Sequence, residues 1–266
     1  MNRAQLVKQI FQKKSYLCIG LDTDLTKIPT PLLSFPDPVF EFNRQIIDAT
    51  RAYCVGYKIN TAFYEALGSK GWISMEKTVE YIPSTHFKIA DAKRADIGNT
   101  SRQYAKAFFE TLPFDAVTLS PYMGEDSIRP FLEYENKWAI VLGLTSNAGA
   151  NDFELLRTDQ GYVYEKVLET VSRWGTTENT MFVIGATQPP WFETIRKLTP
   201  THFYLVPGVG AQGGSLSGVS EKAMIADCGL LVNVSRDIIY ASQDDFVAGA
   251  AKAAMRFQQE MSQYLH

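Results

Sequence analysis

The stretch Phe87-Lys-Ile-Ala-Asp-Ala-Lys-Arg-Ala-Asp-Ile-Gly-Asn-Thr100 joins an apolar segment to the charged pattern D-x-K-x-x-D-I-x-x-T. Phe87, Ile89 and their small neighbours are typical of a core strand, from which Asp91 and Lys93, two residues apart, project to the same side. An ion pair inside or at the mouth of a core is costly to desolvate and adds little stability. We therefore interpret the pair as functional, with a structural salt bridge as the alternative.

Seven further runs of apolar, β-branched or aromatic residues resemble this strand. The eight expected strands are Tyr16–Asp22, Tyr53–Asn60, Phe87–Lys93, Asp115–Ser120, Trp138–Leu144, Met181–Ala186, Phe203–Val209 and Leu230–Ser235. Continuous apolar runs are typical of parallel strands that are covered on both faces. Their spacing, roughly 20 to 40 residues, leaves room for a crossover helix between successive strands.

Helical patterns occupy the intervals between the strands. Asp37 and Pro38 form an N-cap and a first-turn proline that open a helix over Val39–Arg51. The other expected helices are Asn2–Lys13, Asn99–Glu110, Gly161–Trp174 and Ala248–Leu265, and Thr145–Thr180 is expected to be a loop followed by a helix.

The order of these elements predicts the fold class α/β. Eight strands alternating with helices indicate one (β/α)8 TIM barrel, a single domain over residues 1–266 with an N-terminal helix before the first strand. A doubly wound sheet is the alternative fold. No linker-like, low-complexity or repeated segment divides the chain.

The composition excludes several classes of function. Of the 266 residues, 45% are hydrophobic and 21% charged, as in an ordinary globular protein. The formal net charge is -3 and no block of Lys and Arg is present, so we expect no nucleic-acid partner. No apolar run is long enough to cross a bilayer, and Met1–Lys14 lacks the core of a signal peptide, so we expect no membrane partner.

Cysteine and histidine are scarce. Cys18, Cys54 and Cys228 lie in or beside apolar runs, and we interpret them as buried thiols in a reducing cytoplasm. His86 and His202 each precede an expected strand, which in a barrel is the face opposite the active site; the remaining histidine is the C-terminal residue. A histidine-based catalytic or metal site is therefore hard to assemble.

Polar residues recur where the expected strands end, which is where TIM barrels carry out their chemistry. They are Asp22, Lys58, Asp91, Lys93, Thr145-Ser146-Asn147 and Ser235-Arg236. Each has a simpler interpretation: Asp22 as a turn former, Lys58 as a lysine reaching solvent, Ser146 as a turn cap and Arg236 as a surface arginine. Several such residues on one rim are harder to dismiss than any one alone.

The glycine-rich stretch Gly208–Gly218 begins at the end of the seventh expected strand. Glycine permits positive φ and exposes backbone N–H groups, which suits a phosphate-binding loop or a mobile lid; a plain flexible loop is the alternative. Barrels often bind phosphate with the loops after strands seven and eight, so Gln212 and Arg236 are the expected phosphate ligands.

Taken together, these motifs resemble orotidine 5'-phosphate decarboxylases. The matching segments are D-A-K-R-A-D-I-G-N-T from Asp91, G-Y-K-I-N around Lys58, T-S at Ser146, P-G-V-G-A-Q-G-G from Pro207 and S-R at Arg236. They occur in the family's order, and the D-A-K-R start and the chain length resemble the longer bacterial branch. Two residues depart from that branch: Ala95, where glycine is usual, and Ser101, where an apolar or small residue is commoner.

The resemblance implies decarboxylation of orotidine 5'-monophosphate to uridine 5'-monophosphate, the last step of de novo pyrimidine nucleotide biosynthesis, with no cofactor and no metal. By motif position, Lys93 is the proton donor, Asp91 faces the leaving carboxylate, and Lys58 links Asp91 to the ribose. The implied substrate-binding residues are Asp22, Ile97, Thr100, Ser146, Pro207, Gln212, Ser235 and Arg236. The resemblance further implies a homodimer with shared sites, in which the neighbouring subunit supplies Asp96, Ile97 and Thr100.

Physical reasoning agrees with these roles. Loss of carbon dioxide leaves an in-plane carbanion with no conjugated sink, so the protein must supply fixed charge in a water-excluded site. The alternating array Lys58–Asp91–Lys93–Asp96 aims an ammonium at that carbon and can deliver a proton to it. Two rival functions remain open: a related magnesium-dependent sugar-phosphate decarboxylase or aldolase, and a non-catalytic barrel that binds a phosphorylated metabolite.

Overall fold

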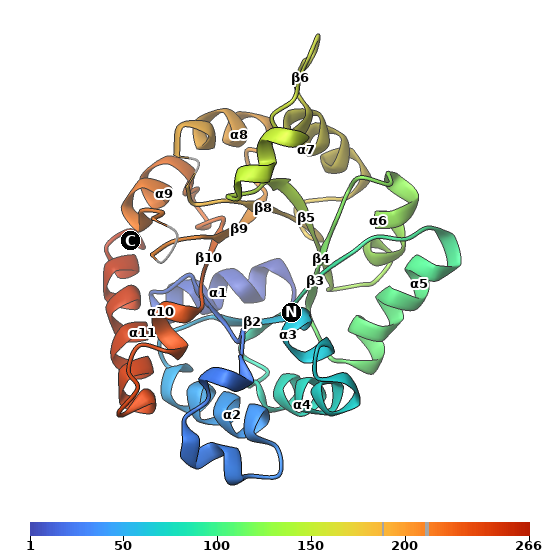
Figure 1. Ribbon diagram of the computed structural model, residues 1–266. Helices are drawn as coiled ribbons and strands as arrows, with labels where there is room; N and C mark the ends of the chain where they lie inside the picture. The colour runs from blue at the N-terminus through green and yellow to red at the C-terminus, as the bar shows by residue number, and fades with distance from the viewer. Residues whose placement is uncertain (188, 211–212) are drawn as a thin grey trace.

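The computed structural model describes residues 1–187, 189–210 and 213–266. Eight parallel strands close into a barrel in the order β1-β10-β9-β8-β5-β4-β3-β2, with helices around it (Figure 1). The barrel strands are β1 (Leu17–Gly20), β2 (Gly56–Asn60), β3 (Phe87–Arg94), β4 (Ala116–Leu119), β5 (Trp138–Leu144), β8 (Thr180–Ile184), β9 (Phe203–Pro207) and β10 (Leu230–Val234). The predicted (β/α)8 barrel is confirmed, and each of the eight expected strands is present.

The described helices follow the pattern expected from the sequence. They are α1 (Arg3–Lys13), α2 (Pro38–Thr50), α3 (Thr61–Glu65), α4 (Gly68–Tyr81), α5 (Gly98–Lys106), α6 (Glu125–Leu132), α7 (Val163–Trp174), α8 (Phe192–Leu198), α9 (Leu216–Ala223), α10 (Arg236–Ile239) and α11 (Phe246–Ser262). The start of α2 is as predicted, because the Asp37 side chain accepts a hydrogen bond from the Phe40 amide and Pro38 occupies the first turn.

The N-terminal helix α1 covers the end of the barrel where the strands begin. The Arg3 guanidinium donates to Thr177 O and Thr201 O, each at 2.7 Å, and pairs with Asp227 at 2.7 Å. These three residues stand shortly before β8, β9 and β10. The buried side chains of Leu6 and Ile10 pack against the core from the same helix. Helix α1 therefore closes the end of the barrel opposite the one where the polar residues were expected.

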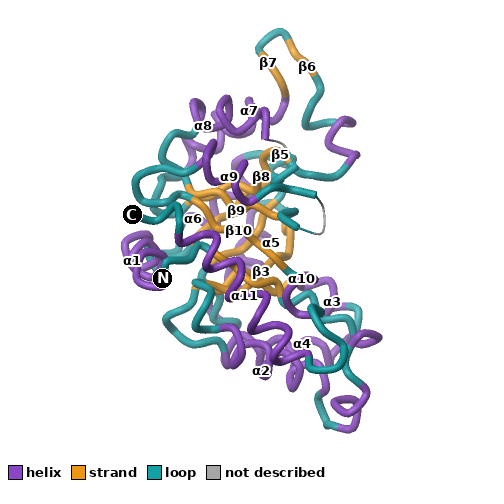
Figure 2. The backbone as a smooth tube through the Cα atoms, turned by 90° about the vertical axis from the view of Figure 1, so that its left-hand side faces the viewer, coloured by secondary structure: helices purple, strands orange, loops and turns teal. Residues whose placement is uncertain are grey.

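The segment between β5 and α7 contains a feature that the sequence did not predict. Two short antiparallel strands, β6 (Arg157–Thr158) and β7 (Gly161–Tyr162), form a hairpin that projects away from the barrel (Figures 1 and 2). Helix α7 consequently begins at Val163, two residues after the expected start at Gly161. The helix expected over Asn99–Glu110 is present as α5 followed by the π-helical turn Ala107–Thr111.

Candidate active site

A cavity of about 310 Å³ lies at the ends of the strands opposite α1. It is lined by Asp22, Lys58, Asn60, Asp91, Lys93, Thr118, Leu142, Thr145, Ser146, Asn147, Val183, Leu205, Pro207, Gly208, Val209, Asn233, Val234, Ser235, Arg236 and Asp237. Strands β5, β8, β9 and β10 contribute apolar side chains to the lining, whereas β2 contributes Lys58 and Asn60, and β3 contributes Asp91 and Lys93. Its position is that of TIM-barrel active sites.

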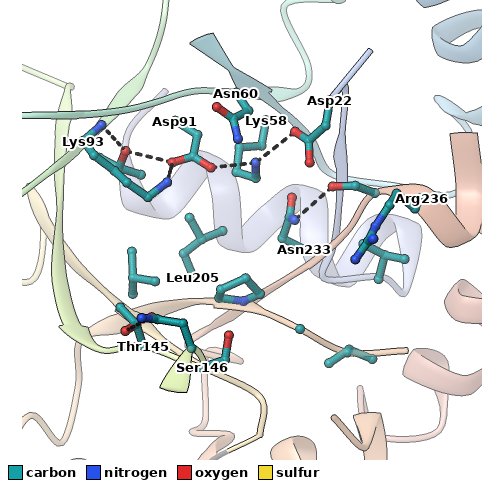
Figure 3. A pocket seen from close by; sticks show the side chains of 18 of the residues that line it. Asp22, Lys58, Asn60, Asp91, Lys93, Thr145, Ser146, Leu205, Asn233 and Arg236 are labelled. Carbon is teal, nitrogen blue, oxygen red and sulfur yellow. Dashed lines mark hydrogen bonds and ion pairs between the residues drawn. The ribbon is translucent and has the colours of Figure 1, made fainter. Parts of the chain in front are cut away.

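Four charged side chains form a row along one side of this cavity (Figure 3). Lys58 Nζ on β2 lies 2.8 Å from Asp91 Oδ2 and 3.3 Å from Asp22 Oδ1, and Lys93 Nζ lies 2.5 Å from Asp91 Oδ1. The Lys58 side chain is 5% exposed and that of Asp91 is 11% exposed, whereas that of Lys93 is 52% exposed. Asp91 is thus held between two ammonium groups, one of them buried and the other open to the cavity.

The row of charges fixes the protonation state of its buried members. Burial alone would raise the pKa of the Asp91 carboxyl, but the ammonium groups of Lys58 and Lys93 outweigh burial and hold this pKa well below its usual range. Burial disfavours the charge on Lys58, and the carboxylates of Asp91 and Asp22 more than compensate and raise its pKa. Asp91 is therefore an anion and Lys58 a cation at neutral pH.

Lys93 stands at a break in the regular strand. Its φ of 46° is left-handed, which is uncommon for a residue other than glycine. The pairing of β3 with β4 shifts register between Ala90 and Arg94, as in a β-bulge, and bulges of this kind re-aim side chains next to active sites. Asp91 and Lys93 do meet, as the sequence predicts, but the bulge rather than regular strand alternation brings the ammonium to the carboxylate.

Asp96, Ile97 and Thr100 lie apart from the residues that line the cavity of their own barrel. Helix α5 begins at Gly98, so Asp96 precedes the helix and does not share a helical face with Thr100. The Asp96 side chain accepts a hydrogen bond from the Ile97 amide at 2.8 Å. Ile97 is 51% exposed, an unusual position for a large apolar side chain.

The remaining expected site residues lie around the same cavity. Ser146 faces the charged row from the opposite side and Arg236 lies at the far end, as Figure 3 shows. Pro207 and Ser235 also line the cavity, whereas Gln212 lies outside the described residues. In the described part of the glycine-rich stretch, Gly208 has a φ of 95°, as the sequence predicts for such a loop.

Glycine at the end of β1 makes room for this arrangement. A Cβ at Gly20 would lie 1.8 Å from Ser235 Oγ and 3.4 Å from Asn233 Oδ1. Strands β1 and β10 pair directly, so any side chain at position 20 would occupy the space in which these two polar groups stand. Gly20 therefore leaves room for the side chains of Ser235 and Asn233, both of which line the cavity.

Sequence reasoning missed several polar residues of this region. Asn60, Thr118 and Asn233 line the cavity, and Asn233 Oδ1 is buried without a hydrogen-bond partner among the described residues. Glu154 accepts from the Thr145 amide at 2.7 Å and so braces the turn that carries Ser146. The position of Asn60 and Asn233 at strand ends was a usable signal, but Thr118 lies inside an apolar run where threonine is ordinary.

The described residues contain no group of three or more His, Cys, Asp and Glu side chains placed to hold a metal ion. Across the same ranges, none of the helices is both long enough and apolar enough to span a membrane. His86 and His202 lie before β3 and β9, at the end of the barrel away from the cavity, as predicted.

A family model described as "Orotidine 5'-phosphate decarboxylase / HUMPS family" matches residues 15–252. The chain belongs to this family. The match extends over nearly the whole barrel, from just before β1 into α11. It therefore includes the strand ends that carry Lys58, Asp91, Lys93 and Arg236, and it confirms the family that these motifs indicated.

Bacterial members of the orotidine 5'-phosphate decarboxylase family are similar over their full length. The chain is 54% identical over 270 residues to orotidine 5'-phosphate decarboxylase of Bacteroides fragilis, covering 100% of this chain and 98% of that protein. It is 56% identical over 269 residues to the enzyme of the same name from Flavobacterium johnsoniae, with 100% and 98% covered. These relatives agree with the bacterial branch that the D-A-K-R motif suggested.

Solved structures of the family share the fold. Leishmania donovani OMP decarboxylase superposes with a TM-score of 0.87 at 34% identity, covering 100% of this chain and 99% of that chain. Leishmania donovani UMP synthase gives a TM-score of 0.88 at 36% identity, covering 98% of this chain and 56% of that chain. The barrel thus corresponds to the whole of the first structure and to about half of the second.

Proposed function

We propose that this protein decarboxylates orotidine 5'-monophosphate to uridine 5'-monophosphate and carbon dioxide, the closing step of de novo pyrimidine nucleotide synthesis. Family membership and relatives named for this activity over their full length support the reaction. The observation that carries the proposal is the row Lys58–Asp91–Lys93 in a cavity at the mouth of the barrel. A protein that only binds a phosphorylated metabolite has no need for two lysines around a buried carboxylate.

In the proposed reaction the bond between the ring carbon and its carboxylate breaks, carbon dioxide leaves, and the electron pair remains on the ring carbon. Lys93 Nζ, exposed to the cavity and anchored on Asp91, presents a positive charge to that pair. An Nζ–H proton then forms the new carbon–hydrogen bond, and the amine regains a proton from water. The sum is loss of carbon dioxide and gain of one solvent proton, without any change of oxidation state at the enzyme.

Asp91 and Lys58 act as the fixed part of this electrostatic arrangement. The low pKa of Asp91 keeps its carboxylate charged next to the position where we place the substrate carboxylate. Lys58 balances that charge from the buried side, and Asp22, 3.3 Å from Lys58, extends the row toward the expected ribose position. Because these charges are held in place before substrate arrives, little reorganisation is needed when charge develops on the ring.

We assign nucleotide recognition to residues on three sides of the cavity. We place the pyrimidine between Lys93 and Ser146, the ribose near Asp22, and the phosphate at Arg236, with Pro207 and Ser235 around it. Gln212 stays a phosphate ligand expected from its motif, outside the described residues. The opposite positions of Ser146 and Lys93 and the distal position of Arg236 in Figure 3 support this order. Phosphate binding far from the reacting bond can close the glycine-rich loop and order the site.

We further propose a homodimer in which Asp96, Ile97 and Thr100 complete the site of the partner barrel. Their position outside their own cavity and the exposure of Ile97 support this assignment. We propose one domain over residues 1–266, a cytoplasmic location in keeping with three free, buried cysteines, and no nucleic-acid or membrane partner.

The test is an absorbance assay with the purified protein and orotidine 5'-monophosphate, with evolved carbon dioxide measured in parallel. We expect turnover in the presence of EDTA equal to that without it. Absence of turnover by the folded protein would refute the proposed function. Loss of activity with EDTA and recovery with magnesium would favour the rival magnesium-dependent sugar-phosphate chemistry.

A further inference from the structure

Thr118 is a buried polar residue in the middle of an apolar strand. It belongs to β4 and is 1% exposed, and it reaches the cavity next to Lys93 and Asp91. Threonine is common in strands, and none of the motifs from the sequence includes this position. Its hydroxyl is the feature that distinguishes it from its neighbours Val117 and Leu119.

The Thr118 hydroxyl makes one hydrogen bond to each of the two residues of the reacting pair. It accepts from the Lys93 amide at 2.9 Å and donates to Asp91 Oδ1 at 3.1 Å. The directions of both bonds are fixed, because an amide N–H only donates and an ionised carboxylate only accepts. One hydroxyl therefore links the backbone of Lys93 to the carboxylate that its own ammonium contacts.

The strand pairing explains why a side chain is needed at this point. Ala90 pairs with Val117 and Arg94 pairs with Leu119, so residues 91, 92 and 93 of β3 stand opposite Thr118 alone. The extra residues of a bulge lose their regular ladder partners. The Thr118 hydroxyl takes the place of the missing partner of the Lys93 amide, at the residue whose φ is 46°.

The second hydrogen bond fixes the rotation of the Asp91 carboxylate. Oδ1 receives the Thr118 hydroxyl and Lys93 Nζ, while Oδ2 receives Lys58 Nζ. With Oδ1 held from β4, the carboxylate keeps one oxygen on each lysine. Without the hydroxyl, this rotation loses its restraint from β4, and the part-buried Lys93 amide loses its acceptor.

We propose that Thr118 is a positioning residue for the decarboxylation, acting through Lys93 and Asp91. It holds Lys93 in its left-handed conformation and sets the carboxylate that anchors the Lys93 ammonium. This inference rests on the proposed function. It assigns to Thr118 no contact with substrate, so it predicts an effect on the chemical step rather than on nucleotide binding.

The experiment compares Thr118→Val, which keeps the side-chain shape and removes the hydroxyl, with Thr118→Ser, which keeps the hydroxyl. We expect Thr118→Val to lower kcat by roughly ten- to hundredfold, as for loss of hydrogen bonds around a charged group, with KM changed by less than about threefold. Thr118→Ser should recover most of kcat. Thr180→Val is the matched control, because Thr180 is equally buried on β8 and lies outside the cavity.

Active sites are counted with a tightly binding nucleotide, so that loss of folded protein is not read as loss of kcat. A Thr118→Val enzyme with kcat within threefold of the parent, a Thr118→Ser enzyme as impaired as Thr118→Val, or an effect confined to KM would each overturn the proposal. Should Thr118→Val fail to fold, Thr118→Ala replaces it in the same comparison.

Hydrogen–deuterium exchange of the Lys93 amide separates this inference from the proposed function. We expect faster exchange at Lys93 in Thr118→Val and parental exchange in Thr118→Ser and Thr180→Val. Unchanged exchange in Thr118→Val would overturn the inference whatever the reaction. If the parent protein did not turn over orotidine 5'-monophosphate, the proposed function would fail, and the exchange data would still decide whether Thr118 holds Lys93.

Discussion

Lys58 Nζ and Asp91 Oδ2 lie 2.8 Å apart on the neighbouring strands β2 and β3, with both side chains nearly excluded from solvent. A buried pair of this kind is a poor source of stability, because desolvation offsets most of its attraction. Removal of one partner is nevertheless costly, since the other charge stays behind. Substitution of either residue is therefore expected to have a large effect.

We expect Lys58→Ala to lower activity by at least about a hundredfold and the free energy of unfolding by about 3 kcal/mol. Both losses are expected because the carboxylates of Asp91 and Asp22 would remain without the Lys58 ammonium that pairs with them. Lys77→Ala is the control, because Lys77 pairs with Asp37 at 3.0 Å with a side chain 47% exposed. That pair should contribute less than about 1 kcal/mol to the free energy of unfolding. Equal effects of the two changes in chemical denaturation and turnover would contradict the role of Lys58.

Mixing two inactive variants tests the shared site. In a dimer of Asp96→Ala and Lys93→Ala subunits, one of the two sites would combine an intact Lys93 with an intact Asp96. Random exchange of subunits should therefore restore up to roughly a quarter of the parental activity. Lack of any recovery, with subunit exchange demonstrated by mass spectrometry, would place Asp96 in the site of its own chain or outside catalysis.

Buried histidines predict an acid limit to stability. Burial, together with nearby cationic side chains, lowers the pKa of His86 and of His202 to about 4. In the unfolded chain these histidines become protonated near pH 6.5, whereas in the folded protein they stay neutral down to about pH 4. The free energy of unfolding therefore falls as the pH falls through this window. Each histidine can contribute up to about 3 kcal/mol to the loss.

Denaturant unfolding between pH 7 and pH 4 measures this dependence. His202→Phe keeps an aromatic ring next to Phe182 but cannot take up a proton. In this variant the free energy of unfolding should fall less between pH 7 and pH 4, because the contribution of His202 is removed. His266→Ala should leave it unchanged, because His266 is an exposed C-terminal residue. A pH dependence that was the same in His202→Phe as in the parent would contradict the assignment of His202 as a buried neutral group.

The barrel was predictable from the sequence because buried parallel strands leave continuous apolar runs. Trp138–Leu144 was expected with the bounds that β5 has, and the other strands differ by a few residues at their ends. The hairpin β6–β7 was not predictable, because its two-residue strands are exposed or half-buried and carry no alternation. Its second strand also falls within the helical spacing that continues into α7.

The site was predictable where polar side chains follow strand ends. Asp22, Lys58, Asp91, Lys93, Ser146 and Arg236 line one cavity, as their positions indicated. The left-handed backbone of Lys93 could not be read from the sequence, because lysine has no preference for positive φ. Thr118 was missed for a related reason: its role depends on the register of β3 against β4, which a single strand does not reveal.

Lys93 is proposed to stabilise and protonate the ring carbanion, and a comparison of the parent protein with Lys93→Ala measures this role. Turnover of orotidine 5'-monophosphate is followed by absorbance, and binding of uridine 5'-monophosphate is measured by calorimetry on the same preparations. We expect rapid turnover by the parent and loss of nearly all activity in Lys93→Ala, with product binding retained because Ser146 and Arg236 are unchanged. Turnover by Lys93→Ala close to that of the parent would contradict it.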